Sequence, residues 1–192
     1  MMKIRTALQT ACLCLTLAVS SQAISQQKDA APGTAKSASA AKAQGSGTLG
    51  KQDAQRLADL ARSDLAEVAA GKLASSKAAS ADVRQYAQHM VDEHGKMLKE
   101  GGELAKSRGI EPPSAPAAKH QAALKKLEGL SGAAFDRAYM QQMVADHQEA
   151  LRLVKGVASK ADDAGLKALA AKAVPKVEEH LAKATQLAKS KS

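Results

Sequence analysis

The chain has 192 residues, of which 28 are Lys or Arg and 19 are Asp or Glu, so it is basic, with a formal net charge of +9. It contains no Trp, two Tyr and one Phe. This scarcity of aromatic residues argues against a β-sandwich, a barrel and a stacking platform for single-stranded nucleic acid. The abundance of Ala, Leu, Lys, Gln and Glu instead favours an all-α protein with one domain.

Residues 1–23 have the three parts of a secretory signal peptide. Lys3 and Arg5 give a positive start, residues 7–19 are mostly apolar, and Ala23 ends a small-x-small cleavage site. The apolar stretch is shorter than the roughly 20 residues that span a bilayer, so we expect cleavage and no transmembrane span in the mature chain. Both cysteines lie inside this segment, so the mature protein should lack disulfides and thiolate metal ligands. These features predict a periplasmic or secreted protein.

Residues 24–50 are rich in Ser, Ala, Gly, Gln and Lys and have almost no large apolar side chain. Such a segment buries too little apolar surface to offset its ordering entropy, so we expect a disordered linker here. Without Lys3 and Arg5 the mature chain keeps a net charge of +7 (26 − 19), which favours anionic partners. Export disfavours nucleic acid among them. Two interpretations of the charge remain open: a solvated lysine surface that keeps the helices soluble, and a basic face that contacts an anionic surface of the cell envelope.

Residues 51–190 show the apolar periodicity of amphipathic helices. Four long segments and one short segment have this pattern: 51–76, 81–107, 114–130, 132–160 and 164–189. Ser80, Ser131 and Asp163 are predicted N-caps, and Gly109 fits the end of the second helix. The pattern predicts an antiparallel four-helix bundle, with the short extra helix in a long crossover between the second and third long helices.

A unit in which an acid directly precedes a histidine recurs in three of the four long helices: Glu93–His94, Asp146–His147 and Glu179–His180. The first two units are 53 positions apart (147 − 94), which indicates a duplicated helix pair. His94, His147 and His180 lie on the apolar faces of their helices, so we expect the three imidazoles to converge inside the bundle. His89 lies off this face and is predicted to point to solvent.

Several motifs of the domain resemble one family of bacterial proteins. They are, in chain order, DLAEV at 64–68, YAQHMVDEH at 86–94, GAAFDRAY at 132–139 and VPKVEEHL at 174–181. They are similar to the exported family called domain of unknown function 4142, whose members are often labelled predicted outer membrane proteins. The resemblance covers roughly residues 52–188. It implies a ferritin-like bundle and brings no established activity with it.

A metal site inside the bundle is the sharpest functional hypothesis. One inward ligand from each long helix would come from Glu67, His94, His147 and His180. Imidazole and carboxylate ligands together suit iron, copper or zinc. The acids that precede the histidines would orient a neighbouring imidazole as hydrogen-bond acceptors outside the ligand set: Glu93, Asp146 and Glu179. A di-iron centre is disfavoured, because Val91, Val144 and Val177 stand where its Glu-x-x-His motif needs glutamate.

The residues also leave a structural alternative open. If each imidazole pairs with an acid on a neighbouring helix, the histidines form a purely structural network, and their pKa values should be raised. The sequence has neither a nucleophile elbow nor a phosphate-binding loop, so we expect no enzymatic activity. The leading function is thus a non-enzymatic binding or stress-related role with an interior metal site. The alternative is a structural or interaction module of the cell envelope.

Overall fold

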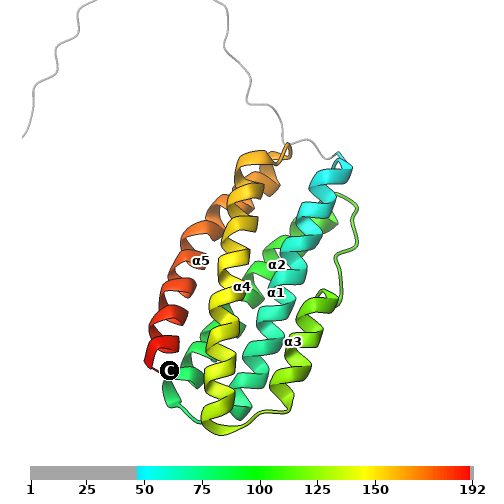
Figure 1. Cartoon of the computed structure of the whole chain (residues 1–192). Helices are drawn as coiled ribbons and strands as arrows, with labels where there is room; N and C mark the ends of the chain where they lie inside the picture. Colours follow the sequence, from blue (N-terminus) through cyan, green and yellow to red (C-terminus); the bar gives the residue numbers. More distant parts are fainter. Residues whose placement is uncertain (1–46, 191–192) are drawn as a thin grey trace, which may run out of the picture. The chain divides into compact units, whose positions relative to one another are not determined.

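The computed structural model of the protein describes residues 47–190 (Figure 1). Within this range the chain forms five α-helices and no strand: α1 (Lys51–Lys77), α2 (Ala81–Ser107), α3 (Ala118–Glu128), α4 (Gly132–Lys160) and α5 (Ala164–Ser190). The predicted signal peptide lies outside the described residues, as does the predicted linker up to residue 46. No helix in the described part combines the length and the apolar character needed to cross a membrane.

The four long helices pack in a closed ring. α1 contacts α2 and α4, and α5 contacts the same two helices, so each long helix has two long neighbours. Short loops at 78–80 and 161–163 join α1 to α2 and α4 to α5 as two antiparallel hairpins. α3 lies in the longer connection, 108–131, and packs on α1 and α4. The protein is therefore an all-α bundle.

The short helix begins later than its sequence pattern predicts. The prediction of 114–130 is wrong at both ends, because α3 covers only Ala118–Glu128. A residue before a proline avoids the helical conformation, so Ala115 cannot open a helix in front of Pro116. Ala117 is also extended, with φ −62° and ψ 152°. The bounds predicted for α2 and α4 agree with the structure, and those of α1 and α5 differ by one residue.

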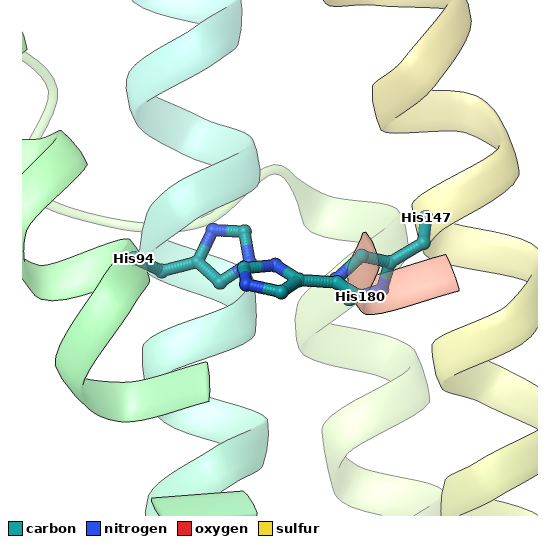
Figure 2. Close-up of side chains that lie close together, drawn as sticks. All are labelled: His94, His147 and His180. Carbon is teal, nitrogen blue, oxygen red and sulfur yellow. The ribbon is translucent and has the colours of Figure 1, made fainter. Parts of the chain in front are cut away.

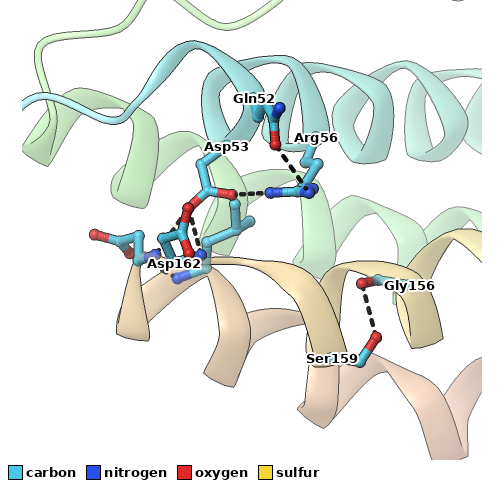
Figure 3. Close-up of polar contacts among 8 residues, drawn as sticks. Gln52, Asp53, Arg56, Gly156, Ser159 and Asp162 are labelled. Atoms are coloured by element: carbon cyan, nitrogen blue, oxygen red, sulfur yellow. Dashed lines mark hydrogen bonds and ion pairs between the residues drawn. The ribbon is translucent and has the colours of Figure 1, made fainter.

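Two buried aspartates connect the hairpins at the starts of α1 and α4. Asp136 accepts backbone N–H bonds from Ala79 and Ser80, at 3.0 and 2.8 Å. Asp53 accepts two N–H bonds from the loop before α5, at 2.9 and 2.8 Å, and an ion pair from Arg56 at 2.6 Å (Figure 3). Each carboxylate thus satisfies backbone donors at the start of a helix in the other hairpin, which fixes the two hairpins against each other.

These aspartates also give the register in which the hairpins are equivalent. Asp53 and Asp136 are 83 positions apart (136 − 53), and so are the cap residues Ser80 and Asp163 (163 − 80). The duplication inferred from the 53-position spacing of the acid–His units therefore has the wrong register. In the observed register His147 is equivalent to an aspartate, Asp64, and not to another histidine.

The buried interior consists of apolar clusters with a polar level between them. One cluster, which includes Met90 and Phe135, lies toward the loop between α1 and α2. Others, which include Leu57 and Val154, lie toward the opposite end. On every long helix the buried histidine or glutamate falls between residues of these clusters, as Glu67 does on α1. The fold therefore places one polar group from each long helix at a single level of the core.

Candidate metal centre

Each of the three histidines faces inward because of its position on its helix. His94 lies one turn after the buried Met90 on α2, and His147 lies one turn after the buried Met143 on α4. His180 lies on the buried face of α5. The exposed fractions of the three residues are 1%, 0% and 2%. Figure 2 shows the three rings reaching toward one another from three different helices.

The three imidazoles form a compact triangle. One ring nitrogen from each lies within 4.8 Å of the other two, and the ring centroids of the pairs are 5.2, 5.5 and 5.5 Å apart. Nitrogens at the corners of a triangle with 4.8 Å sides lie about 2.8 Å from its centre. An inward shift of about 0.7 Å by each ring would bring them to the roughly 2.0–2.1 Å of a zinc–nitrogen bond. The spacing therefore fits a single ion.

Hydrogen bonds on the outer side of two rings decide which nitrogen faces the centre. Nδ1 of His147 lies 2.9 Å from the backbone oxygen of Met143. A carbonyl oxygen only accepts, so Nδ1 donates its proton and Nε2 keeps a lone pair. Nδ1 of His94 lies 2.8 Å from Oδ1 of Asp64, and an ionised carboxylate selects the same tautomer. Histidines that bind metals commonly show this outer hydrogen bond.

Six buried side-chain polar atoms have no hydrogen-bond partner within residues 47–190. Four of them belong to Glu67 and the triangle, and the other two to His120 and Tyr139: Glu67 Oε2, His94 Nε2, His147 Nε2, His180 Nδ1, His120 Nδ1 and the Tyr139 hydroxyl. Such atoms are rare in native proteins, because each costs about 1–3 kcal/mol. Each of the three imidazoles of the triangle contributes one of these unpartnered nitrogens. A cation bound by these nitrogens would satisfy them together.

Comparison with known proteins identifies the family. The family model described as Domain of unknown function (DUF4142) matches residues 35–187. The chain belongs to this family. The fold is similar to the crystal structure of a DUF305 fragment from Deinococcus radiodurans, with a TM-score of 0.66 and 13% identity over 74% of this chain and 98% of that chain. At that identity the similarity shows a shared fold alone. No curated protein matches the chain.

In this DUF4142 protein Glu67 lies beside the triangle and not within it. Its Oε1 is 3.8 Å from Nδ1 of His147, the nitrogen that is turned away from the centre. Burial, together with the charges of Asp146 and Asp64, raises the pKa of Glu67 well above its usual value. The three predicted histidines are thus brought together, whereas the predicted carboxylate ligand contacts one of them from outside.

Asp64 is the partner of the centre that the sequence prediction missed. It contacts His94 directly. Burial raises the pKa of Asp64, although the hydrogen bond to His94 and the charge of that histidine act to lower it. Its position three residues before Glu67, on the same face of α1, was the signal that could have identified it. With the offset of 83 positions between the hairpins, Asp64 corresponds to His147 (147 − 64). Asp64 therefore contacts His94 from the position that a histidine occupies in the other hairpin.

The acids that directly precede the histidines make other contacts. Glu93 forms an ion pair with Lys96 at 2.6 Å and a second one with a lysine of α5. Asp146 accepts a bond from Gln142 at 2.7 Å, and Glu179 is exposed. Within residues 47–190 the structure gives none of these acids a hydrogen bond to the three inward histidines. The structure therefore does not bring them together with the triangle.

Burial also controls the protonation of two of the rings. It lowers the pKa of His147 to about 3, and a charge on His94 adds to this effect. It likewise lowers the pKa of His180 to about 3, with added effects of charges on His94 and His147. This direction is opposite to that expected for a network of acid-paired histidines. At neutral pH both rings are neutral and can offer a lone pair to a cation.

Proposed function

We propose that this protein is a non-enzymatic metal-binding bundle in which His94, His147 and His180 bind one ion of copper, zinc or iron. The observation that carries the proposal is the compact triangle of three buried imidazoles, each with one nitrogen that has no hydrogen-bond partner within residues 47–190. Neutral imidazoles without thiolates suit all three metals. In the usual order of affinity, Cu²⁺ is the divalent ion that such a site binds most tightly.

The structural alternative, in which the histidines only complete a network, needs each imidazole paired with a carboxylate of a neighbouring helix. His94 has such a partner in Asp64, whereas the outer nitrogen of His147 bonds to the backbone of Met143. The inner nitrogens have none within the described residues. The metal proposal thus supplies a reason for the atoms that a purely structural network leaves unpaired.

Glu67 is the fourth protein group that we assign to this centre. Three imidazole ligands leave a coordination position open on a tetrahedral ion, which a water molecule can take. Glu67 contacts His147 from the side turned away from the triangle, and its Oε2 has no hydrogen-bond partner within residues 47–190. Burial raises the pKa of Glu67, and the charge of a bound cation would act against that shift.

The proposal also includes a location and an architecture. The basic, apolar and small-residue segments of residues 1–23 support export to the periplasm or beyond. The ring of α1, α2, α4 and α5, with α3 in the long connection, supports a ferritin-like four-helix bundle with a crossover helix. The net positive charge supports contact with an anionic surface of the envelope. A stress-related role in holding metal outside the cytoplasm is consistent with these features.

Elemental analysis tests the proposal. The protein, purified without an affinity tag, is incubated with Cu²⁺, Zn²⁺ or Fe²⁺ and dialysed, and its metal content is measured. One ion per chain is expected, and a variant with His94→Ala and His147→Ala should lose it. His120→Ala removes a histidine that lies outside the triangle and should keep it. A protein that retains no stoichiometric metal, or a double variant that binds as well as the parent, would contradict the proposal.

A further inference from the structure

Two openings of different chemistry lead toward the histidine triangle. The first is a cavity of about 100 Å³ between the long helices, which ends at Asp64 and His94. Its lining is mostly apolar, and its charged residues beyond Asp64 are three lysines and one glutamate: Lys96, Lys172, Lys176 and Glu100. The three lysines are held in ion pairs by Glu93 and Glu100. A hydrated cation that entered here would cross a mostly apolar lining and would lose water before it reached Asp64 and His94.

The second opening is a groove of about 530 Å³ formed by residues of α2 and α5. Its lining includes two acids, two histidines and one lysine: Asp82, Glu179, His89, His180 and Lys183. These side chains offer carboxylate and imidazole ligands at the surface, where a cation still holds its water. The chemistry of the groove therefore suits a metal ion, whereas that of the apolar cavity does not.

His180 connects this groove to the interior. On one side, the centroid of its ring lies 5.2 Å from the ring centroid of the exposed His89. On the other side it lies 5.2 and 5.5 Å from the rings of His94 and His147. Its own exposed fraction is 2%, and its Nδ1 has no partner within the described residues. A chain of imidazoles therefore runs from the surface to the triangle without a gap.

We propose that the α2–α5 groove is the route by which the metal ion enters, and that His89 and Glu179 form a transient outer site that passes the ion to His180. This inference rests on the proposed function. Neighbouring imidazoles let the ion exchange one ligand at a time, so it sheds water while it always keeps a nitrogen ligand. Glu179 attracts the cation to the mouth of the groove and is not needed in the final complex.

The rate of Co²⁺ uptake tests the role of His89. The metal-free full chain is mixed with excess CoCl₂ in a stopped-flow instrument, and the visible absorption of nitrogen-bound Co²⁺ reports occupancy. His89→Ala should slow loading about tenfold, with the final absorbance and the stoichiometry unchanged. His120→Ala removes a partly buried histidine outside the groove and should change neither value.

A matched pair of charge reversals tests the route independently. Glu178 and Glu179 are neighbours on α5, but Glu179 lines the groove and Glu178 forms an ion pair with Lys155 of α4 at 2.7 Å. Both Glu179→Lys and Glu178→Lys change the net charge equally, so a difference between them reports position. Glu179→Lys should slow loading about threefold more than Glu178→Lys at low ionic strength, and salt should reduce the difference.

The outcomes separate the route from the metal centre. An unchanged loading rate in His89→Ala, or equal effects of the two charge reversals, would overturn the route and leave the centre intact. A lower final occupancy in His89→Ala would make this residue a permanent ligand and would overturn its role as a transient site. Failure of the unsubstituted protein to bind any of Co²⁺, Cu²⁺, Zn²⁺ and Fe²⁺ would overturn both the route and the proposed function.

Discussion

The low pKa of His147 makes the stability of the metal-free protein depend on pH. Burial first, and then a charge on His94, lowers this pKa to about 3, whereas an unfolded histidine titrates near about 6.5. Below that pH the unfolded chain binds a proton that the folded chain does not. Stability is therefore complete above about pH 6.5 and falls as the pH falls. The loss is about 1.4 kcal/mol per pH unit, or about 2 kcal/mol between pH 7 and pH 5.

Two carboxyl groups near His147 act in the opposite direction. The pKa values of Glu67 and Asp64 are raised, mainly by burial, so the folded chain takes up protons that the unfolded chain does not bind. Their effect on stability is most favourable at low pH and is lost as the pH rises through their folded pKa values. The unsubstituted protein shows only the net effect, so a variant is needed to isolate His147.

His147→Asn is a suitable variant, because its amide can donate to the backbone oxygen of Met143 as Nδ1 does now, and it does not titrate. Urea unfolding, followed by far-UV circular dichroism with a chelator present, gives the free energy of unfolding at pH 7 and pH 5. The loss on acidification should be about 2 kcal/mol smaller in the variant than in the parent. Equal losses in the two proteins would refute the claim that burial keeps His147 neutral.

Three further substitutions and metal binding should alter the free energy of unfolding. Gly71→Ala should destabilise the protein by about 1–2 kcal/mol. The added Cβ would meet the backbone oxygen of Ala87 and Cγ2 of Val91 at 2.8 Å, and the cost of this overpacking outweighs the gain in helix propensity. Gly95→Ala, with nothing within 4 Å of its Cβ, should stabilise by up to about 1 kcal/mol, and equal effects would contradict the close approach at Gly71. Asp136→Ala should cost about 2–4 kcal/mol, since two N–H groups lose their acceptor, and a loss below about 0.5 kcal/mol would contradict its role. Metal at 100 times its dissociation constant should add about 2.7 kcal/mol to the parent, and no gain would count against the site.

The sequence was sufficient to predict the helices and the inward histidines, because both depend on positions along single helices. Apolar residues at helical spacing predicted all four long helices to within one residue. The same spacing placed His94, His147 and His180 on buried faces. The short helix was predicted too long, because proline is tolerated in the first turn of a helix, and the sequence does not show that the backbone is still extended at Ala117.

Contacts between helices could not be predicted in the same way, because they depend on how the helices are rotated and where they cross. His89 lies off the apolar stripe of α2 and is exposed as predicted, yet its ring contacts that of His180 on α5. Asp64 and Glu67 share a face of α1, but only the packing of α1 on its neighbours decides which histidine each one reaches. Burial lowers the pKa values of His147 and His180. The acids that stand next to histidines in the sequence do not reveal this effect.

The position of the ion tests the metal centre most directly. Crystals of the protein loaded with zinc or copper, measured at the absorption edge of the metal, would locate it by its anomalous signal. We predict one peak inside the bundle, about 2.0–2.1 Å from Nε2 of His94, Nε2 of His147 and Nδ1 of His180. The outer bonds of His94 to Asp64 and of His147 to the backbone should remain. Peaks only at surface residues, with the three rings unbound, would contradict the metal centre.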